Sequence, residues 1–215
     1  MREPIISAIQ KEKLIVILRG VPKAKLLTLA QAMYDAGIRL LEITYDATGK
    51  ISDEETGENI ALLARHFRDR MYIGAGTVLT EKQVNITKKA GGTFIISPNT
   101  DADVIRQTLA LDMVSIPGAF TPTEAQTAHR LGADFVKLFP MDAMGASYLK
   151  AVRAPLSHIR FLAVGGIDEL NIAEYLKAGA CGFGVGSAII PKNYLENEDY
   201  DAIKNLAQRF LAAIA

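Results

Sequence analysis

Eight short apolar runs recur along the chain at a regular interval, and no other feature of the sequence constrains the fold more. The runs begin between residues 14 and 182, at a mean spacing of 24 residues. An interval of this size holds one strand, two loops and a short helix. The runs span residues 14–18, 39–44, 71–75, 93–96, 113–116, 134–138, 160–164 and 182–185.

The intervals between the runs carry helix-start and helix-end signals. An N-capping side chain begins three of the intervals, and a glycine follows four of the predicted helices. The capping residues are Thr80, Thr121 and Asp168, and the glycines are Gly37, Gly91, Gly132 and Gly179. Strands that alternate with helices in this way predict a parallel sheet with helices packed against it.

Eight strand–helix units favour an α/β fold of one kind, a closed (β/α)8 TIM barrel, over an open doubly wound sheet. The barrel needs about 200 residues, and the chain has 215. A doubly wound sheet has a glycine-rich loop after its first strand, whereas the first run here ends in Arg19–Gly20 without that motif. We therefore predict a single barrel domain over residues 1–215, with a short N-terminal helix in segment 1–13 that covers one end of the barrel.

Charge and cysteine content restrict the partners and the compartment. Lys plus Arg and Asp plus Glu each number 24, so the formal net charge is zero. A neutral chain gives no electrostatic argument for nucleic acid or an anionic membrane as the main partner, although a local basic patch is compatible with it. Cys181 is the only cysteine and cannot form an internal disulfide. No apolar run approaches the roughly 18 residues of a membrane span, so we expect a cytoplasmic protein.

The lysine of the sixth run gives the sharpest chemical signal. Strand alternation places Phe135, Lys137 and Phe139 on one face of the strand, and Val136 and Leu138 on the other. Apolar surroundings disfavour the ammonium form and lower the pKa of a lysine, and a neutral amine can attack a carbonyl to form a Schiff base. A lysine that extends from a strand end to solvent explains the pattern equally well, so both interpretations stay open.

Two further charged residues belong to strands that open into the same barrel mouth. Glu42 lies in the apolar second run, where a carboxylate is costly to bury without a partner, and it is a candidate general acid/base near Lys137. Arg19 ends the first run, and its guanidinium suits a carboxylate or a phosphate. The structural alternatives are ion pairs of Glu42 with Arg19 or Lys137, and of Arg19 with Asp46.

Glycine-rich loops follow the seventh and eighth runs, at Gly165–Gly166 and Gly186–Ser187. Loops in these positions of a barrel often bind phosphate, because glycines let backbone N–H groups approach an anion. Thr77 ends a small-residue stretch after the third run and adds a hydroxyl. The three histidines show no metal-ligand spacing, so no metal site is predicted; they are His66, His129 and His158.

The order and spacing of eight motifs along the chain resemble those of a known family. The motifs are LIVILRG, LLEITY, IGAGTVLT, FIISPN, SIPGAFTPTE, FVKLFP, AVGGI and GVGS. Together they resemble the class I 2-keto-3-deoxy-6-phosphogluconate (KDPG)/4-hydroxy-2-oxoglutarate (KHG) aldolases. The resemblance implies a (β/α)8 barrel, usually a homotrimer, that takes a phosphorylated keto acid to pyruvate through a Schiff base, with no metal and no other cofactor.

The resemblance also implies roles for single residues. Lys137 of FVKLFP matches the Schiff-base lysine, and Glu42 of LLEIT matches the general acid/base. The remaining matches are substrate-binding: Arg19 and Thr77 at the carboxylate end, Pro98 and Phe139 in the pocket wall, and Gly165, Gly166, Gly186 and Ser187 at the phosphate end.

Two positions depart from the pattern of many family members. Asp46 stands where many have an arginine, and Val164 stands in place of a hydroxyl-bearing residue after the seventh run. The motifs AVGG and SPN resemble the branch that acts on the galactonate epimer. The alternatives are an aldolase for unphosphorylated 4-hydroxy-2-oxoglutarate, a non-catalytic paralogue that binds a phosphorylated metabolite, and a metal-dependent aldolase, which the scarcity of histidine disfavours.

Overall fold

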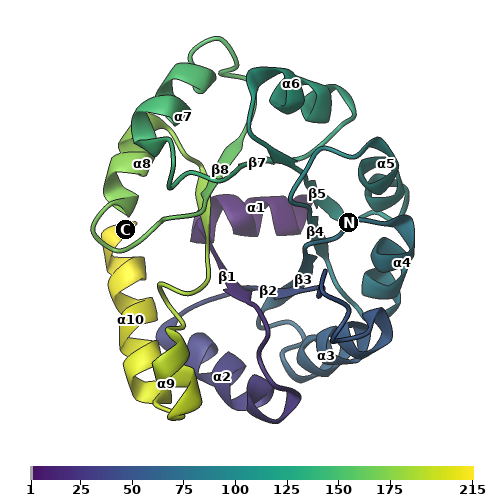
Figure 1. The fold of residues 1–215 in the computed structure, drawn as a ribbon, viewed down its shortest axis with the longest axis vertical. Helices are drawn as coiled ribbons and strands as arrows, with labels where there is room; N and C mark the ends of the chain where they lie inside the picture. The colour runs from purple at the N-terminus through teal and green to yellow at the C-terminus, as the bar shows by residue number, and fades with distance from the viewer. Residues whose placement is uncertain (1) are drawn as a thin grey trace.

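The computed structural model describes residues 2–215, in which parallel strands form a ring surrounded by helices (Figure 1). The strands are β1 (Leu14–Leu18), β2 (Leu40–Thr44), β3 (Tyr72–Gly76), β4 (Phe94–Ile96), β5 (Val114–Ile116), β6 (Gly118–Ala119), β7 (Val136–Leu138), β8 (Phe161–Val164) and β9 (Gly182–Val185). They pair in the order β5-β4-β3-β2-β1-β9-β8-β7-β6. The predicted (β/α)8 barrel is confirmed, and the eight apolar runs match the strands to within two residues at their ends.

The fifth wall of the barrel is split into two short strands, which explains why nine strands stand where eight were predicted. Pro117 separates β5 from β6 and, lacking an N–H group, cannot donate to the ladder. β5 pairs with β4, and β6 pairs with β7. The Pro117 carbonyl still accepts from the Lys137 N–H at 2.9 Å. The split wall therefore joins the two ends of the strand order and closes the ring.

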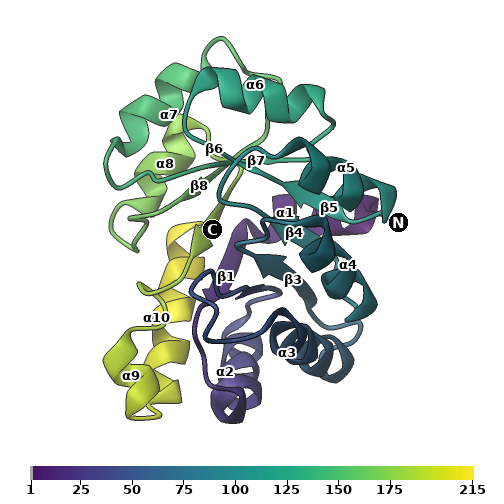
Figure 2. The ribbon, with the colours of Figure 1, turned by 45° about the vertical axis from the view of Figure 1, so that its right-hand side comes forward.

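Ten helices surround or cap the described barrel, and no helix within residues 2–215 is long and apolar enough to cross a membrane. They are α1 (Glu3–Glu12), α2 (Lys23–Ala36), α3 (Asp53–His66), α4 (Glu81–Lys89), α5 (Ala102–Ala110), α6 (Pro122–Arg130), α7 (Gly145–Arg153), α8 (Ile172–Ala178), α9 (Lys192–Glu196) and α10 (Tyr200–Ala213). The C-terminal helix α10 packs beside α2, so the last helix of the chain lies next to the first helix of the ring (Figures 1 and 2).

Strand alternation divides the apolar core into two layers. Residues that point outward, such as Leu41, Val136 and Leu138, belong to a large cluster packed against the helices. Residues that point inward, such as Leu40 and Phe135, belong to a second cluster inside the barrel. Glu42 and Lys137 lie two residues further along the same strands, so alternation turns both side chains inward, as predicted.

The N-terminal helix closes one end of the barrel, as the sequence predicts. Ile5, Ile6 and Ile9 of α1 join the cluster inside the barrel, and α1 crosses the ring in Figure 1. Arg2 donates to both carboxylate oxygens of Asp134, at 3.1 and 3.2 Å, at the start of the β7 segment. Because α1 covers the amino ends of the strands, the carboxyl ends remain open as the barrel mouth.

The helix-end signals are confirmed with one correction. The Thr80 and Thr121 side chains cap α4 and α6, and the four predicted glycines follow their helices with φ values from +86° to +107°. Asp168 does not cap a helix. Its carboxylate accepts from the N–H groups of Leu170 and Asn171, and α8 begins only at Ile172. An aspartate that bonds its own downstream backbone makes a turn, and this turn delays the helix.

Candidate active site

A cavity of about 780 Å³ opens at the carboxyl ends of the strands. The ends of β1, β7, β8 and β9 form its wall, together with the short helix α9. It takes in seven of the ten residues predicted for the site, namely Arg19, Lys137, Phe139, Gly165, Gly166, Gly186 and Ser187. The other three are Glu42, which is buried, and Thr77 and Pro98, which follow β3 and β4 and do not line the cavity.

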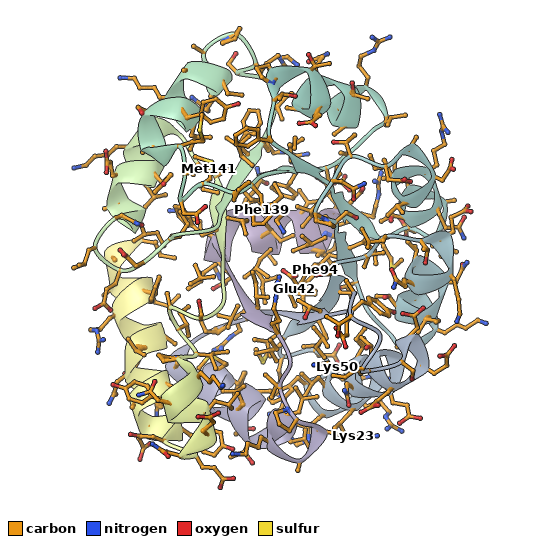
Figure 3. The ribbon with its side chains drawn as sticks, in the orientation of Figure 1. Lys23, Glu42, Lys50, Phe94, Phe139 and Met141 are labelled. Atoms are coloured by element: carbon orange, nitrogen blue, oxygen red, sulfur yellow. The ribbon has the colours of Figure 1, made fainter. Side chains whose placement is uncertain are left out.

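Lys137 and Glu42 point into the barrel from opposite walls. β7 and β2 are separated by three strands on one side of the ring. Lys137 is 6% exposed and Glu42 is 2% exposed. In Figure 3, Glu42, Phe94 and Phe139 lie near the centre of the barrel, whereas Lys23 lies toward the rim of the molecule. The sequence was equally compatible with a Lys137 side chain that extends to solvent, and the burial of Lys137 excludes that interpretation.

Neither group is neutralised by a close partner within residues 2–215. The Lys137 Nζ lies 4.5 Å from the centre of the Phe139 ring, and Glu42 Oε2 is buried without a hydrogen-bond partner. No ion pair joins Glu42 to Lys137 or to Arg19 among the described residues, so these structural alternatives are wrong. A buried polar group left unpaired costs free energy, and such groups persist mainly where function needs them.

Burial moves the pKa values of both groups toward their neutral forms. It raises the pKa of Glu42 above its ordinary value, against the attraction of the Lys137 and Arg19 charges. It lowers the pKa of Lys137, an effect that the Arg19 charge reinforces and the Glu42 charge opposes. A neutral amine is a nucleophile, and a carboxyl group with a raised pKa binds a proton more readily, so it can accept a proton and return it.

Gly76 provides the space that the Glu42 carboxyl group occupies. A Cβ atom on Gly76 would lie 1.5 Å from Glu42 Oε1 and 2.3 Å from its carboxyl carbon. Gly76 ends β3, which pairs with β2 in parallel. The sequence motif GAGT indicated only a small-residue wall, so the dependence of Glu42 on this glycine is a feature that sequence reasoning missed.

Arg19 and Thr77 present polar groups that no described residue engages. The exposed guanidinium of Arg19 forms no hydrogen bond or ion pair within residues 2–215. Thr77 has φ +55°, a left-handed conformation that is strained for a β-branched residue. Strained residues concentrate at functional sites, and Thr77 directly follows Gly76. Both side chains therefore keep their hydrogen-bonding capacity at the barrel mouth.

Asp46 organises its own loop and does not pair with Arg19. Its carboxylate accepts from the backbone N–H groups of Thr48, Lys50 and Ile51 and from the Thr48 hydroxyl, at 2.7–3.0 Å. These bonds, led by those from Thr48, lower the pKa of Asp46 to about 2. The predicted alternative of an Arg19–Asp46 pair is therefore wrong. Asp46, which stands where many family members have arginine, therefore stabilises the turn between β2 and α3. The Asp-x-Thr spacing in the sequence is the pattern that indicates such a turn.

The two glycine-rich loops present free backbone donors to the cavity. Within residues 2–215, the N–H groups of Gly166, Gly186 and Ser187 donate no hydrogen bond. Gly166 has φ +68°, and a Cβ atom there would lie 2.4 Å from Asp142 Cβ, so only glycine fits. Several N–H groups that converge on one concave surface form an anion-binding arrangement.

Helix α9 forms a wall of the cavity that the sequence did not indicate. Lys25 of α2 donates to the carbonyl groups of Leu195 and Glu196, at 3.0 and 3.1 Å, and pairs with Glu198. A cation at a helix C-terminus stabilises that end of the helix. Lys25 thus holds α9 beside the β9 loop. Only the folded structure brings residues 25 and 195 together.

The remaining sequence predictions concern the histidines and the cysteine. His66, His129 and His158 are exposed. Among the described residues, no group of three or more His, Cys, Asp and Glu side chains could hold a metal ion. Cys181 is partly buried just before β9. Burial raises the pKa of its thiol to about 11, which suits a small packing residue and not a reactive thiolate.

The buried carboxyl group predicts a specific pH dependence of stability. The raised pKa of Glu42 means that the folded chain binds more protons than the unfolded chain above pH 4.5, so the Glu42 contribution to stability is lost as pH rises. Thermal unfolding from pH 4.5 to 8 should therefore show Glu42→Gln gaining in Tm relative to the parent as pH rises. The exposed Glu55→Gln is the control. A constant difference for Glu42→Gln would contradict the assigned pKa direction.

A (β/α)8 barrel with a buried lysine and a buried glutamate below its open mouth has the architecture of a barrel enzyme. A family model for KDPG and KHG aldolases matches residues 5–206. The chain is 38% identical over 178 residues to the 2-dehydro-3-deoxy-6-phosphogalactonate aldolase of Escherichia coli K12, covering 82% of this chain and 84% of that protein. This chain belongs to the KDPG and KHG aldolase family.

Two solved structures superpose closely on the barrel. The one described as native KDPGal has a TM-score of 0.84 and 35% identity, and the match covers 94% of this chain and 93% of the other. The KDPG aldolase of Legionella pneumophila, captured with pyruvate as a covalent carbinolamine, has a TM-score of 0.84 and 28% identity, over 94% and 96% of the two chains. A structural relative of this chain therefore forms a covalent intermediate with pyruvate.

Proposed function

We propose that this protein is a class I aldolase that cleaves a 2-keto-3-deoxy-6-phospho sugar acid to pyruvate and glyceraldehyde 3-phosphate. The observation that carries the proposal is the buried amine of Lys137, which faces the buried carboxyl group of Glu42 inside the barrel. Family membership supports the reaction class. We further propose that residues 1–215 act as one barrel domain.

The reaction begins when the neutral Lys137 amine attacks the C2 keto carbon of the substrate. Loss of water from the carbinolamine gives an iminium ion, which withdraws electrons from the neighbouring bonds. Glu42, acting through a water molecule, moves protons during this step. It then takes the proton of the C4 hydroxyl group.

Removal of that proton breaks the C3–C4 bond. The bond electrons pass to the iminium group and form an enamine, and glyceraldehyde 3-phosphate leaves as the aldehyde. Protonation of the enamine at C3 and addition of water then release pyruvate and regenerate the Lys137 amine. The raised pKa of Glu42 suits a group that must both accept and return a proton.

The two ends of the cavity fit the two anionic ends of this substrate. Arg19 would hold the carboxylate, Phe139 would form the pocket wall, and the loops of Gly165–Gly166 and Gly186–Ser187 would hold the phosphate. Thr77 and Pro98 lie outside the cavity lining, so a carboxylate contact by Thr77 and a wall contact by Pro98 rest on the family resemblance alone. Fixing both ends sets the distance from the keto carbon to Lys137. Between the two epimers we favour the galactonate type, supported by the AVGG and SPN motifs. Equal kcat/KM for both epimers would reject this preference.

The second candidate substrate is 4-hydroxy-2-oxoglutarate, which has no phosphate, and a charge at Ser187 distinguishes the two. Ser187→Glu places a carboxylate beside the free N–H groups of the β9 loop. We expect kcat/KM for the phosphorylated substrate to fall about 100-fold or more, because like charges and lost hydrogen bonds each cost roughly 1–3 kcal/mol. Turnover of 4-hydroxy-2-oxoglutarate should change less than about fivefold, and Ser187→Gln serves as the uncharged control. An equal loss on both substrates would remove the phosphate assignment.

We also propose that the protein is a cytoplasmic homotrimer, as the family resemblance implies. The exposed Phe120 ring stacks on Tyr148 at 5.7 Å, and Met144, at the start of the same helix α7, is also exposed. Apolar side chains exposed together are typical of contact surfaces. These residues are therefore candidates for the contact between subunits.

A further inference from the structure

A second cavity, of about 1240 Å³, lies at the end of the barrel opposite the proposed active site. It is bordered by the outer side of α1, by the end of α3 with the turn that follows, and by the end of α4. Arg39 and Tyr72, which line it, stand at the amino ends of β2 and β3. We call this feature the basic groove, because of the charges described next.

The lining of the basic groove is strongly positive although the chain as a whole is neutral. Seven Lys and Arg residues and three Asp and Glu residues line it, a net charge of +4. Two of the cations are neutralised locally, by the pairs Lys23–Glu58 at 2.7 Å and Lys11–Glu12 at 3.5 Å. The other five form no ion pair within residues 2–215; they are Arg39, Arg65, Arg68, Arg70 and Lys89.

Two of these arginines are held against the same aromatic ring. The guanidinium carbon of Arg39 lies 4.5 Å from the centre of the Tyr34 ring, and that of Arg70 lies 5.2 Å from it and 5.1 Å from the Phe67 ring. Stacking on an aromatic face fixes the plane of a guanidinium. Neither arginine forms an ion pair within residues 2–215, so the two positive charges on one ring repel each other until an anion binds.

Backbone contacts fix the two guanidinium groups further and leave donors free. Arg39 uses Nη1 to donate to the carbonyl groups of Tyr34 and Ile38, at 3.0 and 2.8 Å. Arg70 uses Nη2 to donate to the His66 carbonyl. A guanidinium carries five N–H donors, so most of the donors on each arginine are not used by the protein. The groups are positioned before any ligand arrives, which lowers the entropy cost of binding.

We propose that the basic groove is a binding site for a small polyanion with several phosphoryl groups, such as an organic polyphosphate. Arginine pairs with phosphate through two parallel hydrogen bonds. Four arginines and a lysine along an extended groove suit a ligand with several phosphoryl groups better than a single phosphate ion. The site is separate from the Lys137 cavity, so the proposal does not depend on the aldolase function.

Isothermal titration of the full chain with inorganic tripolyphosphate tests the proposal. The Ser187→Glu variant is used as the background, because its added charge disfavours anions in the active-site cavity. We expect one tripolyphosphate site per chain, with an affinity that falls as the salt concentration rises. Arg39→Gln and Arg70→Gln should each weaken binding about tenfold or more, and the exposed Arg130→Gln on α6 should change it less than twofold. Circular dichroism checks that each variant is folded, and Arg70→Lys serves as a second, charge-preserving variant.

Each other outcome contradicts a stated part of the proposal. No binding, or binding that both glutamine variants leave intact, overturns the site itself. Equal affinity for orthophosphate and tripolyphosphate overturns the requirement for several phosphoryl groups. Tighter binding of a single-stranded oligonucleotide than of tripolyphosphate overturns the small-molecule class and indicates nucleic acid instead.

Discussion

Replacing Lys137 with methionine is expected to abolish cleavage of the phosphorylated keto acid, with kcat falling by on the order of 10⁴-fold or more, because no Schiff base forms without the amine. The fold should survive. Methionine fills a similar volume, and the substitution removes a buried amine that has no hydrogen-bond partner within residues 2–215. The measurement is a coupled assay of aldehyde release, together with thermal unfolding.

The matched control is Lys150→Met, which removes an exposed lysine from α7. It should leave kcat within about twofold of the parent, since exposed substitutions away from the site have small effects. Lys137→Arg keeps a long side chain that ends in nitrogen but supplies no nucleophile at neutral pH, so it should be as inactive as the methionine variant. Activity above about 1% of the parent in a well-folded Lys137→Met protein would contradict the role of the amine.

Gly76→Ala is expected to lower kcat by about 100-fold or more, although Gly76 itself has no chemistry. The added methyl group would lie 1.5 Å from Glu42 Oε1, so the carboxyl group must move. A displacement of about 1 Å at a catalytic group can cost on the order of 100-fold in rate. The pH profile of kcat should also change, because Glu42 leaves the environment that raises its pKa.

A neighbouring glycine separates this effect from general steric damage. Gly74 lies on the same strand and the same face, and a Cβ atom there would lie 2.2 Å from Phe94, not from Glu42. Gly74→Ala should therefore lower Tm without changing the pH profile. Gly76→Ala should also lower Tm. Adding Glu42→Asp, which shortens the side chain, to the Gly76→Ala protein should recover part of that Tm loss. An unchanged pH profile in Gly76→Ala would mean that this glycine does not position Glu42.

The inward positions of the site followed from local rules of strand geometry. Alternation along β7 and β2 was enough to place Lys137 and Glu42 inside the barrel, because a side chain on a strand has only two directions. The rule that barrel loops at the carboxyl ends of strands build the site then placed Arg19 and Ser187 at one cavity. These inferences needed only the order of the strands along the chain and the alternation of side-chain direction within each strand.

Other features depended on contacts between distant segments, which no local rule supplies. The space for Glu42 beside Gly76 depends on the pairing of β2 with β3, and the position of α9 depends on Lys25. Thr77 and Pro98 follow the carboxyl ends of the barrel strands β3 and β4, where site residues are expected. They lie outside the cavity lining because the cavity opens toward β1 and the β7–β9 side of the mouth. Pro117 splits the fifth strand, and an apolar run alone did not indicate this.

The most direct test of the covalent mechanism is reduction of the protein with borohydride in the presence of pyruvate, followed by peptide mapping. A Schiff base between pyruvate and a lysine becomes a stable secondary amine on reduction, so its mass identifies the residue. We predict one adduct per chain, on Lys137, and none in Lys137→Met or without pyruvate. Reduction that leaves the chain unmodified, or an adduct on a different lysine, would contradict the mechanism. Neither result would bear on the basic groove, which the tripolyphosphate titration tests separately.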